Sequence, residues 1–194
     1  MSSSESSGQI AGQGGSAWDT AIMIGKAAFS SPVILEGDER FSFCKPLNVE
    51  DIDQLEPFDL VITFVRGSVF HANVFMDLPG HGPSILDFSI REGLSSYGVQ
   101  TLAQFVESAE ACDMIYHARA KPDAEGLCVD TDMALLRIEP FFPGHEHGTY
   151  NYLKNNCQHF AMVLLFGVHE SFSVNFARDT IRFAGTALSS SFSK

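Results

Sequence analysis

Three apolar segments separated by short turn signals dominate the middle of the chain. Residues 59–65 form a nearly continuous apolar run, typical of a buried strand, and Arg66-Gly67 ends it. A second apolar segment covers residues 69–76. After the Pro/Gly-rich turn at 79–83, residues 84–90 alternate between two sets of side chains. This close spacing predicts three antiparallel strands joined as a meander.

The remaining patterns predict a mixture of helices and strands. Residues 101–111 have helical apolar spacing, whereas 113–118 and 133–138 are predicted as strands, the last ended by Pro140. An apolar run after residue 156 predicts a helix that begins near Cys157 and ends at Gly167. Weaker patterns predict helices over residues 17–28 and 173–188 and a short strand over 32–35. Together these elements predict the α+β class, with an antiparallel sheet packed against the helix that carries Cys157.

Composition divides the chain into one domain and its extensions. The Ser/Gly/Gln-rich residues 1–16 are expected to be a disordered tail, and residues 17–56 an N-terminal extension. The domain itself is expected over residues 57–170, followed by a C-terminal helix and tail over 171–194. With 194 residues and 45% hydrophobic side chains, the chain can build one ordinary core.

Charge and cysteine spacing exclude several classes of function. The formal net charge of −12 would repel a phosphate backbone, so we expect no nucleic-acid partner. The four cysteines lie far apart without C-x-x-C spacing, so we expect neither a zinc ribbon, nor a redox pair, nor any other metal or cofactor. The N-terminus lacks the pattern of a secretory signal, and no apolar run is long enough to span a bilayer. A cytoplasmic protein is therefore expected.

The segment around Cys157 has the pattern of a reactive thiol. Asn155 and Asn156 are both good N-cap residues, which would place the cysteine in the first helical turn. There, unpaired backbone N–H groups and the positive end of the helix dipole favour a thiolate, which is the nucleophilic form. The other reading of such a cysteine is a buried core thiol, which is the reading for the three remaining cysteines.

A thiol nucleophile needs a base and a group that orients the base. His71 opens the second strand, where its side chain could face a helix packed across the sheet. If the hairpin turn centres near His81, His71 lies roughly opposite Arg91, and Asp87 on the returning strand becomes its neighbour. Asp87 could equally be a solvated strand residue. Asn73 and His81 stay open as alternative orienting residues.

Histidines near the cysteine raise a second chemistry. His145, His147, Cys157 and His159 contain ligand types that zinc uses. However, side chains at i and i+2 of a helix diverge, so His159 cannot easily join Cys157 as a ligand or serve as its base. A structural role for His159, with its ring bonded to the backbone, is expected instead.

Three short motifs together resemble a known family. Pro57-Phe58-Asp59-Leu60-Val61, His71-Ala72-Asn73-Val74-Phe75-Met76-Asp77 and Asn156-Cys157-Gln158-His159-Phe160 are similar to motifs of the lecithin retinol acyltransferase-like proteins. These are a permuted branch of the NlpC-type, papain-like thiol hydrolases. The resemblance implies Cys157 as nucleophile and His71 as base, with the second family histidine falling near Asp87 or at His81. The chain departs from the family at Phe58 (family Gly), at Asn73 (family Ala) and in a longer hairpin turn.

The expected function follows from the thiol, the base and the resemblance. We expect an acyltransferase or lipid acyl hydrolase that works through a thioester intermediate. The alternatives are a thiol peptidase or isopeptidase and a catalytically inactive binding domain on the same fold. The expected partner is an acyl-bearing lipid or peptide substrate. Peripheral contact with a membrane and the oligomeric state stay open.

Overall fold

The computed structural model describes residues 35, 38–64, 71–91, 94–109, 112, 114–175 and 178–179. The helix predicted over 17–28 lies outside the described residues, and so do residues 32–34 of the predicted short strand. Leu35, the last residue of that strand, is helical, so the prediction is wrong there. Of the helix predicted over 173–188, residues 173–175 and 178–179 are described, and they are helical.

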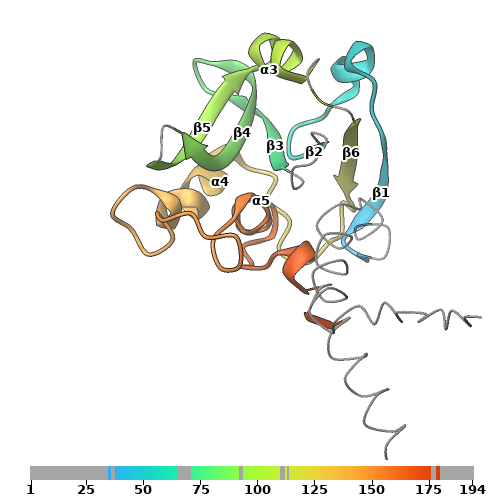
Figure 1. Cartoon of the computed structure of the whole chain (residues 1–194). Helices are drawn as coiled ribbons and strands as arrows, with labels where there is room; N and C mark the ends of the chain where they lie inside the picture. The colour runs from blue at the N-terminus through green and yellow to red at the C-terminus, as the bar shows by residue number, and fades with distance from the viewer. Residues whose placement is uncertain are drawn as a thin grey trace, which may run out of the picture.

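The described residues form one six-stranded antiparallel sheet (Figure 1). Its strands, in chain order, are β1 (Phe41–Pro46), β2 (Leu60–Phe64), β3 (His71–Leu78), β4 (Gly82–Arg91), β5 (Leu94–Thr101) and β6 (Met114–Ala120). Their order across the sheet is β1-β6-β2-β3-β4-β5. The predicted meander corresponds to the neighbouring strands β2, β3 and β4 and is confirmed.

Helices cover both sides of this sheet. They are α3 (Leu102–Ala109), α4 (Thr131–Ile138) and α5 (Cys157–Phe166), with short 3-10 helices η1 (Val49–Gln54) and η2 (Glu139–Phe141). Figure 1 shows α4 and α5 together below the sheet and α3 at the opposite end, and α5 packs against β3, β4 and α4. The predicted α+β class, with an antiparallel sheet and a few helices, is confirmed.

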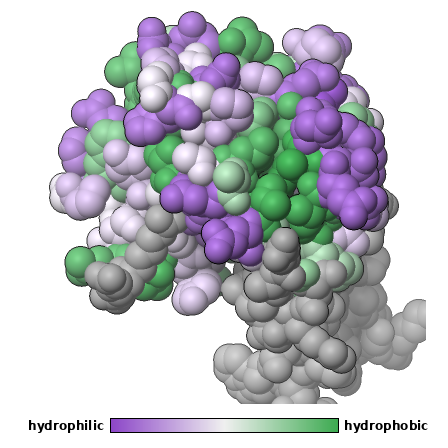
Figure 2. Space-filling view, turned by 90° about the horizontal axis from the view of Figure 1, so that it is seen from above, coloured by the Kyte–Doolittle hydropathy of each residue, from purple (hydrophilic) through white to green (hydrophobic). Residues whose placement is uncertain are grey.

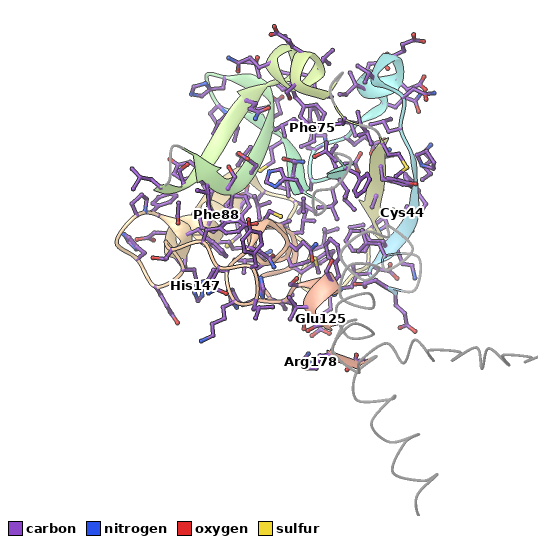
Figure 3. The ribbon with its side chains drawn as sticks, in the orientation of Figure 1. Cys44, Phe75, Phe88, Glu125, His147 and Arg178 are labelled. Carbon is purple, nitrogen blue, oxygen red and sulfur yellow. The ribbon has the colours of Figure 1, made fainter. Side chains whose placement is uncertain are left out.

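Two apolar clusters sit on opposite faces of the sheet because strand side chains alternate between faces. Figure 3 labels one aromatic residue from each cluster: Phe75 points toward the α3 end, and Phe88 points toward α4 and α5. Phe88 is fully buried against Phe141 and Phe160. The larger cluster, which holds Phe88, therefore fixes α5 to the sheet.

The strand predicted over 133–138 is wrong, because these residues form α4. Asp130 caps this helix by accepting the Met133 N–H at 2.8 Å. Ala134 and Ile138, four residues apart, are the buried positions, which is helical spacing. The apolar residues of so short a segment fit either a helix or a strand. The capping hydrogen bond favours the helix here.

Both edge strands of the sheet escaped prediction. β1 and β5 each have one neighbour, and their side chains are largely partly buried or exposed, so no strong apolar run marks them. β1 pairs with β6, so this part of the expected N-terminal extension belongs to the sheet.

The β3–β4 register decides which side chains share a face. Leu78 pairs with Gly82 and Asn73 with Asp87, so the turn centres on Gly80 rather than on His81. The expected pairing of His71 with Arg91 is therefore wrong. Moving the centre by one residue shifts the pairing by two, which keeps Asp87 on the face of His71 and Asn73. Beyond Asp87, β4 pairs only with β5, so β3 and β4 separate at this point.

Phe58 adopts a backbone conformation that usually requires glycine. Its φ is +73°, and it is the one non-glycine residue with positive φ among those described. An L side chain in this region costs roughly 1–2 kcal/mol. The Phe58 N–H donates to the Phe75 carbonyl at 2.7 Å, and the Phe75 N–H donates to the Asp59 carbonyl at 2.9 Å. The glycine of the similar motif is thus replaced at a position that glycine suits.

Candidate active site

Helix α5 begins at Cys157 because Asn156 caps it. The Asn156 side chain accepts the backbone N–H groups of Gln158 at 2.9 Å and His159 at 3.1 Å. In return, His159 Nδ1 accepts the Asn156 N–H at 3.3 Å, which completes a capping box. The predicted N-terminus and the predicted backbone bond of His159 are both confirmed. At the other end, Gly167 ends the helix with φ of +70°, as predicted.

A buried polar cluster holds the first turn of α5 in place. Gln158 Nε2 donates to the Ser173 hydroxyl at 2.8 Å, and its Oε1 accepts from the Ser171 hydroxyl at 2.7 Å and the Ser173 N–H at 3.0 Å. All three residues are buried. The side chain of Gln158 therefore anchors the segment after α5 and is not directed at the thiol.

Cys157 lies where β3 and β4 separate. The backbone N–H of Ala72 in β3 donates to the Cys157 sulfur, and the His71 side chain hydrogen-bonds the same sulfur. The cysteine is 3% exposed. The parted strands thus give the helix terminus a place beside the sheet, with the thiol directed at the first residues of β3.

His71 joins this thiol to Asp87. Its Nε2 lies 3.0 Å from Asp87 Oδ2, so Nδ1 is the ring nitrogen left for the sulfur. The His71 side chain is 32% exposed, whereas that of Asp87 is 6% exposed. Asp87 is therefore not a solvated strand residue, and the predicted contact between these two side chains is present. The His71 side chain is thus the member of this pair that a substrate can reach from solvent.

Electrostatics favour an ion pair between the thiol and the imidazole. Burial opposes charge on His71, but the Cys157 thiolate and the Asp87 carboxylate outweigh it and raise the pKa of His71 to about 10. Burial likewise opposes the thiolate, but charge on His71 and hydrogen bonds from His71, Ala72 and Tyr150 lower the pKa of Cys157. Both shifts stabilise thiolate with imidazolium near neutral pH.

The two other candidates for orienting His71 lie elsewhere. His81 is in the turn after β3, at the far end of a strand that spans roughly 25 Å. The Asn73 amide donates to the backbone carbonyls of Val61 at 3.1 Å and His71 at 3.3 Å. Asn73 therefore joins strands, and Asp87 is the residue that contacts the imidazole.

Three other histidines stack behind the helix start. The ring of His169 lies 4.1 Å from that of His147 and 4.6 Å from that of His159, centroid to centroid. Burial and the neighbouring imidazoles lower the pKa of His159 to about 4. Within the described part of the chain, no group of His, Cys, Asp or Glu has an arrangement that could hold a metal ion.

Tyr150 is a site residue that sequence reasoning missed. Its hydroxyl lies 3.9 Å from the Cys157 sulfur. The chain turns back between the two residues, through an isolated bridge that pairs Asn151 with Asn155. A tyrosine seven positions before the cysteine has no regular spacing that would predict contact. Only the turn signal of the Asn-rich segment could have suggested that the chain doubles back.

A separate hollow lies away from this thiol. Figure 2 looks onto the α3 end of the molecule and shows apolar side chains between polar ones. A hollow of about 700 Å³ is lined there by residues that include Leu47, Val49, Cys112 and Ile115. None of the three residues Cys157, His71 and Asp87 lines it, so its size does not identify it as the reactive centre.

None of the helices in the described ranges is long and apolar enough to cross a bilayer.

Comparison with protein-family models, curated proteins and solved structures found no match for this chain. The chemistry open to the site is set by its own residues: a buried thiol at a helix start, an imidazole and a carboxylate.

Proposed function

We propose that this chain is a cysteine-nucleophile acyltransferase or acyl hydrolase that works through a thioester intermediate. One observation carries the proposal: the Cys157 sulfur is hydrogen-bonded to His71, whose second ring nitrogen contacts Asp87 at 3.0 Å. This is the nucleophile, base and orienting group that covalent acyl transfer requires. The finer fold assignment, a permuted papain-like domain, is part of the same proposal.

The proposed reaction begins with the thiolate. Cys157 Sγ attacks the acyl carbonyl carbon, and the carbonyl π electrons move onto oxygen to form an oxyanion. When the oxyanion collapses, the bond to the leaving group breaks, and imidazolium His71 gives that group its proton. The neutral imidazole then takes a proton from water or an acceptor alcohol, which attacks the thioester and releases the acyl group. Cys157 and His71 return to the ion pair.

Asp87 contributes through His71. Its carboxylate accepts the Nε2–H of the imidazole, which fixes the ring and stabilises the imidazolium. Since the pKa of Cys157 is lowered and that of His71 is raised to about 10, the ion pair spans neutral pH. Activity should fall on the acid side as the thiolate is protonated and on the alkaline side near pH 10 as imidazolium is lost.

The similarity of the motifs to the lecithin retinol acyltransferase-like proteins favours ester substrates. The same three side chains would also cleave amides, so a thiol peptidase is the alternative that substrate comparison must exclude. The His71 side chain is partly exposed, which is compatible with either class of substrate.

The test combines selective labelling with turnover. Iodoacetamide should modify Cys157 before Cys44 and Cys112, with an apparent pKa below the ordinary thiol value of about 8.5. Mass spectrometry after incubation with p-nitrophenyl octanoate should then find one acyl group on Cys157. Phospholipid vesicles, retinyl ester and a fluorogenic peptide library would rank the substrate classes.

Several outcomes would contradict the proposal. An apparent pKa of Cys157 at or above 8.5, or absence of any acyl adduct on it, would leave a non-catalytic binding domain. Turnover of peptides but not of esters would move the function to the peptidase class. Cys112→Ser is the matched control, because it removes a partly buried thiol elsewhere in the fold.

A further inference from the structure

The segment that follows α5 is bonded to the residues on both sides of the proposed nucleophile. The Ser171 hydroxyl donates to Gln158 Oε1 at 2.7 Å, and it accepts from Asn156 Nδ2 at 3.3 Å. Asn156 and Gln158 are the chain neighbours of Cys157. Both are buried, and Ser171 itself is 1% exposed. One hydroxyl outside the proposed triad thus holds the residue before the thiol and the residue after it.

The bond to Asn156 favours the orientation in which its amide caps α5. The amide nitrogen donates to Ser171 and, at 2.8 Å, to the Tyr152 carbonyl. The amide oxygen is thereby left for the backbone N–H groups of Gln158 and His159. An amide flipped end for end would direct its own N–H groups at these donors and leave the first turn of α5 uncapped. Ser171 therefore supports the helix start that favours the thiolate.

The same hydroxyl also begins the next helical segment. It accepts the Val174 N–H at 3.4 Å, and the Ser171 carbonyl accepts the Asn175 N–H at 2.9 Å, which is the pattern of an N-cap. Ser173 takes the remaining bonds of the Gln158 amide, with its N–H at 3.0 Å and its hydroxyl at 2.8 Å. Two helix starts therefore share one buried hydroxyl, and a shift of either one breaks bonds to the other.

We infer that Ser171 is a positioning residue for the proposed reaction, because it holds the Cys157 sulfur against His71 by bonding the residues on either side of it. This inference rests on the proposed function, since it concerns the nucleophile of that reaction. Ser171 transfers no proton and acts only through the place of the thiol. A displacement of about 1 Å at a reacting atom can cost about 100-fold in rate. The catalytic unit then extends past residue 170, the end expected for the domain.

The experiment measures how fast, and at what pH, the thiol reacts in Ser171→Ala, which removes only the hydroxyl. We expect the acylation burst with p-nitrophenyl octanoate to slow by about 10-fold or more at saturating ester, because the sulfur is less well placed. The acid limb of the iodoacetamide profile should move to higher pH by about half a pH unit, the size of a helix-terminus effect. Ser171→Thr keeps the hydroxyl and should restore both.

Ser84→Ala is the matched control. Ser84 is a fully buried serine of β4 whose hydroxyl donates to the Gly82 carbonyl at 2.9 Å. It lies near the turn of the β3–β4 hairpin, whereas His71 lies at the open end, so this variant should lose stability and keep the wild-type burst and profile.

Ser173→Ala tests the cluster more gently. It removes the acceptor of Gln158 Nε2 but keeps the backbone N–H that donates to Gln158 Oε1. We expect an intermediate slowing of the burst, by about threefold. Urea denaturation checks that each variant is folded under the assay conditions.

The outcomes separate this inference from the proposed function. A wild-type protein without a burst would overturn both. A burst that persists unchanged in folded Ser171→Ala would overturn the role of Ser171 alone, as would equal slowing in Ser84→Ala or a folded Ser171→Thr as slow as Ser171→Ala. If Ser171→Ala does not fold, Ser173→Ala decides, and an unchanged burst in that variant overturns the inference.

Discussion

Two histidine–aspartate pairs lie on the same face of the sheet. Each joins an imidazole to a carboxylate, but the two pairs differ in solvent exposure and in their other hydrogen-bond partners. His71 meets Asp87 at 3.0 Å, and His117 of β6 meets Asp59 at 2.7 Å. Val61 pairs with Asn73 on one side and with His117 on the other, which places both histidines on one face of the sheet. The pairing of imidazole with carboxylate cannot by itself mark a reactive site.

The His117–Asp59 pair is buried, and its carboxylate also accepts hydrogen bonds from Arg119. Arg119 donates to the Asp59 carboxylate from Nε and from one terminal nitrogen, both at 2.9 Å, and the Glu56 N–H donates to it at 2.8 Å. The His117 side chain is 2% exposed, and its Nδ1 is buried without a hydrogen-bond partner. This pair fixes β2 against β6, and nothing can approach its ring.

The His71–Asp87 pair has a contact with a thiol and an exposure to solvent that the His117–Asp59 pair lacks. Its second ring nitrogen is left for a sulfur, and about a third of its side chain is open to solvent. A thiol on the free nitrogen and an approach for substrate, rather than the carboxylate, therefore distinguish the candidate site from a structural pair.

The largest expected effect comes from removing the nucleophile. Cys157→Ser should reduce turnover of p-nitrophenyl octanoate by about 10⁴-fold or more, because a serine hydroxyl beside His71 is far less ionised than the thiol. Steady-state kinetics and intact mass would measure turnover and adduct. Cys112→Ser should behave like the wild type. Full activity in Cys157→Ser would remove the distinction between the two pairs.

Replacing one carboxylate in each pair tests the comparison directly. Asp87→Asn should lower kcat by roughly 10²–10⁴-fold, because an amide can hold the wrong imidazole tautomer and cannot stabilise imidazolium. The alkaline limb of the pH–rate profile should move to lower pH, since the pKa of His71 loses one of its supports. Normal kcat with an unchanged profile would show that Asp87 is structural.

Asp59→Asn should act on stability instead. Burial raises the pKa of Asp59, but hydrogen bonds from His117 and Arg119 outweigh it and leave the pKa lowered. Neutralising this carboxylate weakens the charged hydrogen bonds that it accepts from His117 and Arg119, at a cost of about 3 kcal/mol in the free energy of unfolding, although Arg119 keeps Glu56 as a partner. Urea denaturation would measure it. The acylation burst of the folded fraction should stay within about twofold of wild type, and a specific loss of activity would break the comparison.

Lowering the pH should destabilise the protein through a third histidine, His159. The pKa of His159 is lowered to about 4, below the ordinary value of about 6.5. Between these values the unfolded chain binds a proton that the folded chain does not, so stability should fall as pH drops from 6.5 to 4 and then level off, by about 3 kcal/mol from this residue.

His159→Gln separates this effect from other acid-sensitive groups. Glutamine at this position can accept the Asn156 N–H as histidine does, but it does not titrate. The difference in unfolding free energy between wild type and variant should therefore change by about 3 kcal/mol between pH 6.5 and 4. A difference that stays constant with pH would contradict the lowered pKa.

The smallest effect concerns Phe58, which precedes Asp59 in a left-handed conformation. Phe58→Ala loses packing and keeps the strain, whereas Phe58→Gly loses packing and relieves it. Glycine should therefore be more stable than alanine here by about 1 kcal/mol, the reverse of the usual order. Denaturation midpoints of the two variants would test this, and an alanine variant of equal or greater stability would disprove the strain.

Sequence patterns predicted the centre of this fold better than its margins. β2, β3 and β4 follow from apolar runs because their side chains are buried by neighbours on both sides. Apolar runs do not predict the edge strands β1 and β5, which have a neighbour on one side only. They do not predict helix α4 either, because the capping hydrogen bond that favours it is not part of the apolar pattern.

The candidate site divides in the same way. The contact of Asp87 with His71 could be predicted because it depends only on the parity of the hairpin register, and a turn centre misplaced by one residue keeps that parity. The approach of Tyr150 to Cys157 depends on the path of an irregular loop, which no periodicity encodes.

The β3–β4 hairpin and the docking of α5 are expected to form at different stages of folding. The hairpin that brings His71 beside Asp87 closes a short loop, whereas bringing Cys157 to His71 spans most of the domain. Long-range closures of this kind are entropically costly and form late. During synthesis and folding, Cys157 should therefore behave as an ordinary, unactivated thiol, and its reactivity should appear only once α5 has docked.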